Sequence, residues 1–511
     1  MSIMLGMASR LRKLQNMKTT AAALVFETTR RSFGDVAVAG NESNNIKKKK
    51  VSLYSKISPL GNPNLEMTPT LDDWIQKGNK VRESEVKQIV HDLRRRRRFH
   101  HALEVSEWMN KKGICAFTTT DHAVQLDLIG KVNGFLEAEK YFNGLNDQHK
   151  TDKTYGALLH SYVRQRETDK SLSHFQKMKE RGFLSPVAYN DIMRLYIHTG
   201  KSDKINDVLE EMKRSGISPD NLSYRMCINT FGDKMDIGGM ESMLTDMEKD
   251  PNIIMDWNTY AVVANHYIRG KLKDKAITAL KKAENLVEKD ALGYNHIISL
   301  QAQLGNKEDL LRLWGLQKTQ CKRQINRDYI IMMKSLVKLA EFEEAKKLLT
   351  EWNSSGNVYD FQVPRIIIDG YLENNLCGDA KDLLDNLLKD GKATMPGSWC
   401  LVAVDLLKNK DIGTCINCME SAFTLPLERK DWKVDSKVVE KLLHGVGEYA
   451  SIQDAESFVQ KLKKFVELDR GMYHALLQGY VCSSKETSKL MEDMEACGIE
   501  QDAETKKILG L

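Results

Sequence analysis

The stretches SLSHFQKM (171–178) and INDVLEEM (205–212) share one pattern and begin 34 residues apart. Each starts with a small or apolar residue, carries a mainly apolar or aromatic pair at its fourth and fifth places, and ends in Met. These places recur at the spacing of one face of an α-helix. Each stretch is therefore predicted to be an amphipathic helix, and the pattern decides the fold because it recurs along the chain.

Further copies of the pattern extend over most of the sequence. They are ALEVSEWM (102–109), AEKYFNGL (138–145), MESMLTDM (240–247), AITALKKA (276–283), LLRLWGLQ (310–317), AKKLLTEW (345–352), AKDLLDNL (380–387), AESFVQKL (455–462) and TSKLMEDM (487–494), with a degenerate copy, TCINCMES (414–421). Successive copies begin 36, 33, 34, 35, 36, 34, 35, 35, 34, 41 and 32 residues apart. Such a regular period indicates a repeat architecture.

Each unit also has an opening helical stretch, such as TYGALLHSYVRQ (154–165), AYNDIMRLYIHT (188–199), TYAVVANHYIRG (259–270) or DYIIMMKSLVKL (328–339). Turns with Gly or polar residues join the two helices of a unit. Pro186, Pro219, Pro251, Pro364 and Pro396 fall at the junctions between units, where they avoid the ~3 kcal/mol cost of a helix interior. One hairpin cannot bury its apolar stripe alone, but stacked hairpins can. We therefore predict an all-α solenoid of about ten to twelve helical hairpin repeats of ~35 residues.

Length and composition suit such an array. The chain has 511 residues, more than the roughly 250–300 that one core supports. Lys and Arg number 76 against 70 Asp and Glu, so the net charge of +6 permits an anionic partner without requiring one. The Cys415–Cys418 pair lacks the two further ligands of a structural zinc site, and no apolar run reaches the ~18 residues of a membrane span. We predict no metal, no cofactor, no small-molecule substrate and no membrane partner.

The N-terminus differs from the rest of the chain. Residues 1–26 contain no acid and interleave basic residues, among them Arg10, Arg12 and Lys18, with Met, Leu and Ala. This composition is typical of an organellar transit peptide, and a disordered basic tail is the alternative. We predict a transit peptide and linker over 1–50, a lead-in over 51–81 and the repeat array over 82–511. The expected compartment is the mitochondrial matrix, with the chloroplast as the alternative.

The closing phrases HFQKMKERGFLSPVAYN (174–190) and EEMKRSGISPDNLSY (210–224) resemble the pentatricopeptide repeat consensus. The early Trp and Leu-Gly of tetratricopeptide repeats are absent. The resemblance covers roughly residues 82–508. The lead-in SLYSKISPLGNPNLEMTPTLDDWIQKGNKVRESEVKQIV (52–90) resembles a plant subgroup of short P-class members, mostly assigned to mitochondria. The resemblance implies a right-handed α-α superhelix that binds RNA and has no catalytic domain of its own.

Motifs for catalysis are lacking. Some pentatricopeptide proteins end in a deaminase-like domain, which needs an HxE and a PCxxC motif for its zinc. This chain has no HxE, and Thr414 stands before Cys415 in place of Pro. No P-loop, dinucleotide fingerprint or serine-nucleophile elbow occurs. We therefore expect the chain not to be an enzyme.

Repeats of this family read one base each, with two or three side chains. The resemblance implies that the first reader follows the opening Tyr, the second lies at the junction before the next helix, and a sandwiching residue precedes the first reader by three. Carried over, Asn190 pairs with Asp220, a pair that resembles the uridine-reading combination, and Val187 is the sandwich. The further candidate readers are Asn295, which faces Ile325, and the junction residues Ser185, Asp256 and Asp290. An Asp at a junction could equally cap the next helix.

Other first-reader positions depart from the family pattern, since they hold Gly156, Arg225, Ala261, Ile330, Arg365 and Cys400. For phosphate contacts we predict Arg164, Arg194 and Arg225 on the opening helices. The run Arg94 to Arg98 must surround its helix, so it forms either a solvated face and turn or a phosphate contact.

Three functions fit these observations. The leading hypothesis is a mitochondrial single-stranded RNA-binding protein that acts in transcript stability, processing, splicing or translation. The second is a structural subunit of a mitochondrial ribosome or another complex, which the degenerate readers favour. The third is a protein-binding scaffold without RNA.

Overall fold

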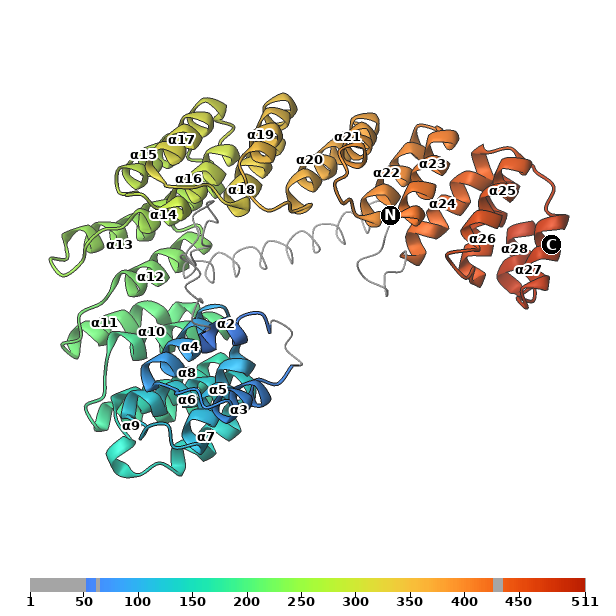
Figure 1. The fold of residues 1–511 in the computed structure, drawn as a ribbon. Helices are drawn as coiled ribbons and strands as arrows, with labels where there is room; N and C mark the ends of the chain where they lie inside the picture. Colours follow the sequence, from blue (N-terminus) through green and yellow to red (C-terminus); the bar gives the residue numbers. More distant parts are fainter. Residues whose placement is uncertain (1–51, 61–64, 426–434, 511) are drawn as a thin grey trace, which may run out of the picture. The chain divides into compact units, whose positions relative to one another are not determined.

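The computed structural model describes residues 52–60, 65–425 and 435–510 (Figure 1). Within these ranges the regular structure is α-helix, with two short 3-10 helices, η2 (Asp147–His149) and η3 (Ser202–Lys204), and no strand. The predicted all-α fold class is confirmed. The predicted transit peptide and linker, residues 1–50, lie outside the described residues.

The chain divides into two compact units, one up to Ala279 and one from Leu280 onward. The first unit contains α2 (Leu53–Ile57), α3 (Thr68–Gln76), α4 (Glu83–Arg95), α5 (Phe99–Lys111), α6 (Thr119–Val132), α7 (Phe135–Asn143), α8 (Asp152–Arg164), α9 (Thr168–Glu180), α10 (Pro186–His198), α11 (Ile205–Arg214), α12 (Asn221–Asp233), α13 (Ile237–Lys249) and α14 (Trp257–Arg269). Helix α15 (Lys273–Asn285) spans the division.

The second unit contains α16 (Ala291–Gln303), α17 (Lys307–Gln320), α18 (Asn326–Lys338), α19 (Phe342–Ser354), α20 (Gln362–Glu373), α21 (Cys377–Lys389), α22 (Pro396–Lys408), α23 (Ile412–Thr424), α24 (Ser436–Tyr449), α25 (Ile452–Leu462), α26 (Arg470–Cys482), α27 (Ser488–Ala496) and α28 (Ala503–Leu509). From α4 to α27 the helices alternate as the opening and second members of successive pairs, which agrees with the predicted number of hairpins.

Within each unit, successive opening helices pack on one another. In the first unit α6, α8, α10, α12 and α14 follow one another in this way, and in the second unit α16, α18, α20, α22, α24, α26 and α28 do so. The core lies between each such helix and its second helix. The residue that begins the repeated phrase is buried completely in most copies, as Ala102, Ser171 and Ala345 show, whereas Thr414 and Thr487 are half-buried. The sequence pattern therefore marked the core face correctly.

One close approach explains a glycine in this packing. Helices α24 and α26 are neighbours in the second unit. A methyl group on Gly479 would lie 2.8 Å from the backbone nitrogen of Glu448 and closer still to the carbonyl oxygen of His444. Backbone atoms cannot move aside as a side chain can, so this contact requires the absence of a Cβ atom.

The lead-in is folded against the first pair of repeat helices. The carboxylate of Glu104 accepts hydrogen bonds from the backbone N–H groups of Met67 and Thr68, each at 2.7 Å. Asp72 accepts from the Trp108 indole at 2.8 Å and forms an ion pair with Lys112 at 2.9 Å. Helices α2 and α3 thus extend the stack of hairpins toward the N-terminus.

The arginine run largely serves this packing. Arg98 donates to the backbone carbonyls of Ser58 and Leu60 in the lead-in. Arg94 forms an ion pair with Asp127 at 3.0 Å, and the guanidinium of Arg96 lies 5.8 Å from the centre of the Tyr54 ring. These three side chains hold elements together, which favours the structural interpretation over the phosphate contact.

Candidate nucleic-acid interface

The predicted reader pair Asn190 and Asp220 is in direct contact. Asn190 lies on α10, one residue after the buried Tyr189, and Asp220 is the N-cap of α12. The Asn190 amide donates to both carboxylate oxygens of Asp220 at 3.1 Å, and its own oxygen accepts from the Ser223 hydroxyl at 2.7 Å. Asn190 is only 2% exposed, so Asp220, which is half-buried, is the more accessible member of the pair.

Asp220 also caps its own helix. Its Oδ1 atom accepts from the backbone N–H of Ser223 at 2.8 Å, and its backbone N–H donates to the Ser223 hydroxyl at 3.2 Å. This reciprocal arrangement is a capping box. The base-reading and capping interpretations of a junction Asp are therefore compatible, because one carboxylate meets both groups.

The next junction repeats this arrangement with a cation. Arg225 takes the position of Asn190 on α12, and its Nη1 atom donates to Asp256 Oδ2 at 2.6 Å. Asp256 caps α14 through Thr259 and also accepts from Asn221 at 3.2 Å. Burial works to raise the pKa of Asp256, but the Arg225 charge and the hydrogen bonds from Thr259 and Asn221 outweigh it and hold the pKa below the usual 3.8. The carboxylate is ionised near neutral pH.

Asn295 meets a carboxylate that the sequence spacing had not indicated. Its amide donates to Asp328 Oδ1 at 2.6 Å, and its oxygen accepts from Gln317 at 3.2 Å. Asp328 lies three residues beyond Ile325, and its other oxygen accepts the Ile325 backbone N–H at 2.9 Å. Asn295 and Asp328 are both buried. The carboxylate that meets Asn295 therefore belongs to the first turn of α18 and not to the cap position. Both Asn295 and Asp328 lie inside the protein.

A fourth polar junction lies near the C-terminus and was missed in the sequence. His474 follows the buried Tyr473, as Asn190 follows Tyr189, and its Nε2 atom lies 2.9 Å from the Thr505 hydroxyl and 3.5 Å from Asp502. Asp502 caps α28. Hydrogen bonds from Thr505, together with the nearby His474 and Arg470, lower the pKa of Asp502 to about 2. The Tyr-His pair followed by a later Asp was the signal available in the sequence.

The remaining candidate readers act as caps in this structure. Ser185 accepts the backbone N–H of Ala188 at 3.3 Å at the start of α10, and Asp290 accepts that of Leu292 at 2.9 Å at the start of α16. The first readers of their repeats, Gly156 and Ala261, offer no polar side chain. Val187, the predicted sandwich residue, is 64% exposed on the first turn of α10 and is accessible to a ligand.

The three arginines predicted to bind phosphate differ in their surroundings. Arg164 is exposed at the end of α8 and makes no hydrogen bond or ion pair with the other described residues. Arg194 forms an ion pair with Asp191 at 2.7 Å, and Arg225 is held by Asp256. Arg166 and Arg194 both lie close enough to His198 that, after burial, their charges lower its pKa. The ends of α8 and α10 therefore bring two arginines close together, beside an imidazole that is neutral near neutral pH.

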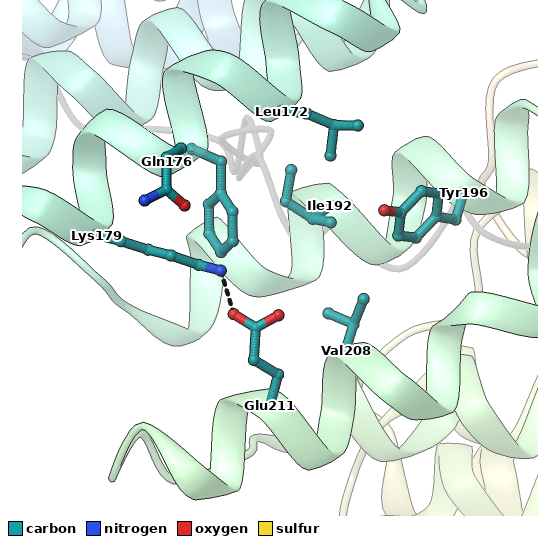
Figure 2. A pocket seen from close by; sticks show the side chains of 8 residues that line it. Leu172, Gln176, Lys179, Ile192, Tyr196, Val208 and Glu211 are labelled. Atoms are coloured by element: carbon teal, nitrogen blue, oxygen red, sulfur yellow. Dashed lines mark ion pairs between the residues drawn. The ribbon is translucent and has the colours of Figure 1, made fainter.

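A pocket of about 220 Å³ lies elsewhere on α10 (Figure 2). Ile192 and Tyr196 line it together with residues of α9 and α11, and the Lys179–Glu211 ion pair stands at its side. Ile192 is two residues from Asn190, about 200° around the helix, so the two side chains leave α10 on opposite faces. The pocket is not part of the row of reader positions.

The described residues show neither a metal site nor a membrane-spanning helix. They contain no group of three or more His, Cys, Asp or Glu side chains placed to hold a metal ion. Burial raises the pKa of Cys415 and of Cys418 to about 12, as expected for packed thiols. Within the same ranges, every helix is too short or too polar to cross a membrane.

Comparisons with known proteins agree with the repeat pattern. Residues 153–183 match the PPR repeat and residues 184–233 the PPR repeat family. A mitochondrial pentatricopeptide repeat-containing protein of Arabidopsis thaliana is 48% identical over 464 residues, which cover 90% of this chain and 94% of that protein. Another such protein from the same plant, also named mitochondrial, is 31% identical over 465 residues, and the match covers 92% of that protein.

Among solved structures, the chain is similar to the pentatricopeptide repeat protein PPR10 in complex with an 18-nucleotide psaJ RNA element. The identity is 15%, the TM-score 0.36, and the match covers 87% of this chain and 74% of that one. The mitochondrial location predicted from the N-terminal composition is confirmed by the relatives in Arabidopsis thaliana. Because relatives 48% and 31% identical match over 90% of its length, the chain belongs to the pentatricopeptide repeat family.

Proposed function

We propose that this protein binds single-stranded RNA in mitochondria and acts in organellar RNA metabolism, in transcript stability, processing, splicing or translation. It does so as a binding protein and not as an enzyme. The observation that carries the proposal is the junction of Asn190, Asp220 and Ser223, where a buried amide holds a half-exposed carboxylate beside the exposed Val187. A carboxylate oxygen can accept the N3–H of uracil, and Val187 can pack on the face of the base.

The polar junctions recur with the repeats. Arg225 with Asp256, and His474 with Asp502, are arranged as Asn190 is with Asp220. Reading of one base per helical repeat requires polar groups at this spacing. The exposed Arg164 and Arg166 near the end of α8, together with Arg194 on α10, supply attraction for the phosphate backbone.

The proposal is tested by crosslinking within the organelle. The tagged chain is expressed in plant cells, mitochondria are irradiated, and RNA bound to the purified protein is sequenced. We expect short footprints that are enriched over an untagged control and that recur at few transcript positions. Recovery of no RNA above that control would contradict the proposal.

A structural role in a ribosome or another complex is the second candidate. The ion pairs of Arg194 and Arg225, and the absence of polar readers at Gly156, Ala261 and Ile330, favour it. A chain that binds through shape and backbone contacts does not need base readers. This role predicts co-sedimentation with ribosomal subunits that persists after mild ribonuclease treatment, whereas binding to free transcripts would be lost.

A further inference from the structure

The two consecutive junctions of α12 differ in the hydrogen-bonding groups that they leave available. At the first, Asp220 is held by the buried Asn190 and by Ser223. Its Oδ2 atom has the Asn190 amide as its one partner among the described residues, at 3.1 Å, and retains accepting capacity. A base at this junction therefore meets an acceptor.

At the second junction the carboxylate is fully occupied. Asp256 Oδ1 accepts from the backbone N–H of Thr259 at 2.9 Å and from its hydroxyl at 2.8 Å. Asp256 Oδ2 accepts from Arg225 at 2.6 Å and from Asn221 at 3.2 Å. A carboxylate has about four lone-pair sites, so Asp256 has no acceptor left for a ligand.

Arg225 supplies the donors at this junction. Its Nη1 group is used by Asp256 and, at 3.4 Å, by Thr259, while Nε and Nη2 bond to no described residue. These two groups form one edge of the planar guanidinium, with two parallel N–H donors. The Arg225 side chain is 16% exposed, whereas Asn190 at the equivalent position is 2% exposed. Asp256 fixes the orientation of the guanidinium and leaves that edge for another acceptor.

We infer that Arg225 determines base specificity at the position next to that of Asn190 and Asp220, and that it selects a base with two adjacent acceptors. Guanine offers such a pair in O6 and N7, and cytosine offers one in N3 and O2. Adenine and uracil offer no such pair. In adenine the N6 amino donor lies beside N1 and N7, and in uracil the N3–H donor lies between O2 and O4. The inference rests on the proposed RNA-binding function. It gives Arg225 a role in base contact, in place of the phosphate contact expected from its charge.

The test uses oligoadenylate probes of one length that carry a uridine at the centre. Each of the four probes has the same base on both sides of the central uridine, which is guanine, cytosine, adenine or uracil. The result is therefore the same whichever way the RNA strand runs along the repeats. For the full chain we expect the guanine or the cytosine probe to bind about tenfold more tightly than the adenine and uracil probes, as a bidentate contact allows. Comparison of guanine with cytosine identifies the base edge.

Arg225→Gln is the informative variant. Glutamine can still donate to Asp256, but one donor and one acceptor suit adenine and not two acceptors. We expect the tenfold preference to disappear and the adenine probe to gain relative to the others. Arg269→Gln is the matched control, because it removes the same charge from a guanidinium that is also paired with an Asp. It should leave the order of the four probes unchanged. Thermal melts of both variants check the fold.

The outcomes separate the two proposals. If the full chain binds all four probes within twofold of one another, or if Arg225→Gln weakens them equally, Arg225 does not select the base and the inference is overturned. If the chain binds none of the probes, both the proposed RNA-binding function and the inference about Arg225 are overturned.

Discussion

At the scale of single residues, buried polar groups in this protein are arranged to meet one another across repeat junctions. Asn190 illustrates the rule, because Asp220 and Ser223 satisfy its amide where water cannot reach. A buried polar group that lacks such partners costs about 1–3 kcal/mol. The junctions therefore join neighbouring hairpins as well as presenting groups to a ligand.

A buried histidine provides a test at this scale. His174 on α9 donates a hydrogen bond from Nε2 to the Tyr155 carbonyl at 3.0 Å, and its ring stacks on the Tyr155 ring with the ring centres 5.1 Å apart. Burial, with a contribution from Lys177, lowers the pKa of His174 below the usual 6.5, although the carbonyl contact opposes the shift. The unfolded chain then binds a proton at a pH where the folded chain does not. The free energy of unfolding is therefore not reduced by this histidine above about pH 6.5, and it decreases as the pH drops below that value.

We expect His174→Phe to flatten the loss of stability between about pH 7 and pH 5, as measured from urea-unfolding midpoints across that range. His91 is exposed on α4, so His91→Phe serves as the control and should keep the slope of the original chain. An unchanged slope for His174→Phe would show that this histidine does not link protonation to folding.

The contact between Asn190 and Asp220 could be expected from the family resemblance, while their role as base readers stays a prediction. Asn190 and Asp220 lie 30 residues apart, close to one repeat, and the structure brings them together. The contact of Asn295 with Asp328 could not be found in this way, because the acid stands one helical turn beyond the aligned junction. The ion pair of Arg225 with Asp256 was also missed, since a charge predicts attraction to phosphate but not which neighbour will take it.

At the scale of elements, the turn inside most of the described hairpins contains one residue with a positive φ, and the turn between α24 and α25 is an exception. Gly200 and Gly305 have φ values of 73° and 75°, while Arg166, Lys271 and Ala340 have φ values of 63°, 60° and 58°. Residues other than Gly pay roughly 1–2 kcal/mol for this conformation. The turn geometry is thus imposed by the packing of the two helices and not by the local sequence.

Exchange of Gly and Ala at this turn should change stability in opposite directions. Ala340→Gly relieves the steric strain and should raise the free energy of unfolding by about 0.5–1 kcal/mol, after the entropy of Gly is subtracted. Gly305→Ala should lower it by a similar amount. The thermal midpoints of the two variants and the parent chain measure both changes. Equal midpoints would mean that the turn is not strained in solution.

The extents of the elements were nearly predictable. The predicted opening stretches at 154–165, 188–199, 259–270 and 328–339 correspond to α8, α10, α14 and α18, each of which begins two residues earlier and ends one residue earlier. The shift arises because the first turn precedes the aromatic residue and contains the cap contacts, as Asp256 shows for α14. The folding of the lead-in onto α5 was not predictable, since it depends on single hydrogen bonds such as that from Met67 to Glu104.

At the scale of the whole molecule, charge is largely balanced between neighbouring repeats. Lys275 pairs with Glu241 at 2.7 Å and Lys318 with Glu351 at 3.1 Å, and both pairs join consecutive hairpins at the surface. Exposed pairs of this kind contribute at most about 1 kcal/mol each. With a net charge of +6, the attraction for RNA must come from local positive charges such as those of Arg164, Arg166 and Arg194.

The most direct test of the central claim is a titration of the purified full chain against random-sequence single-stranded RNA at two salt concentrations. RNA binding through phosphate contacts predicts micromolar or tighter affinity at low salt. It also predicts that the logarithm of the binding constant falls linearly with the logarithm of salt concentration, with a slope of about −0.7 per neutralised phosphate. No binding at micromolar protein and low salt would contradict the account and would favour a ribosome-docked or scaffold role.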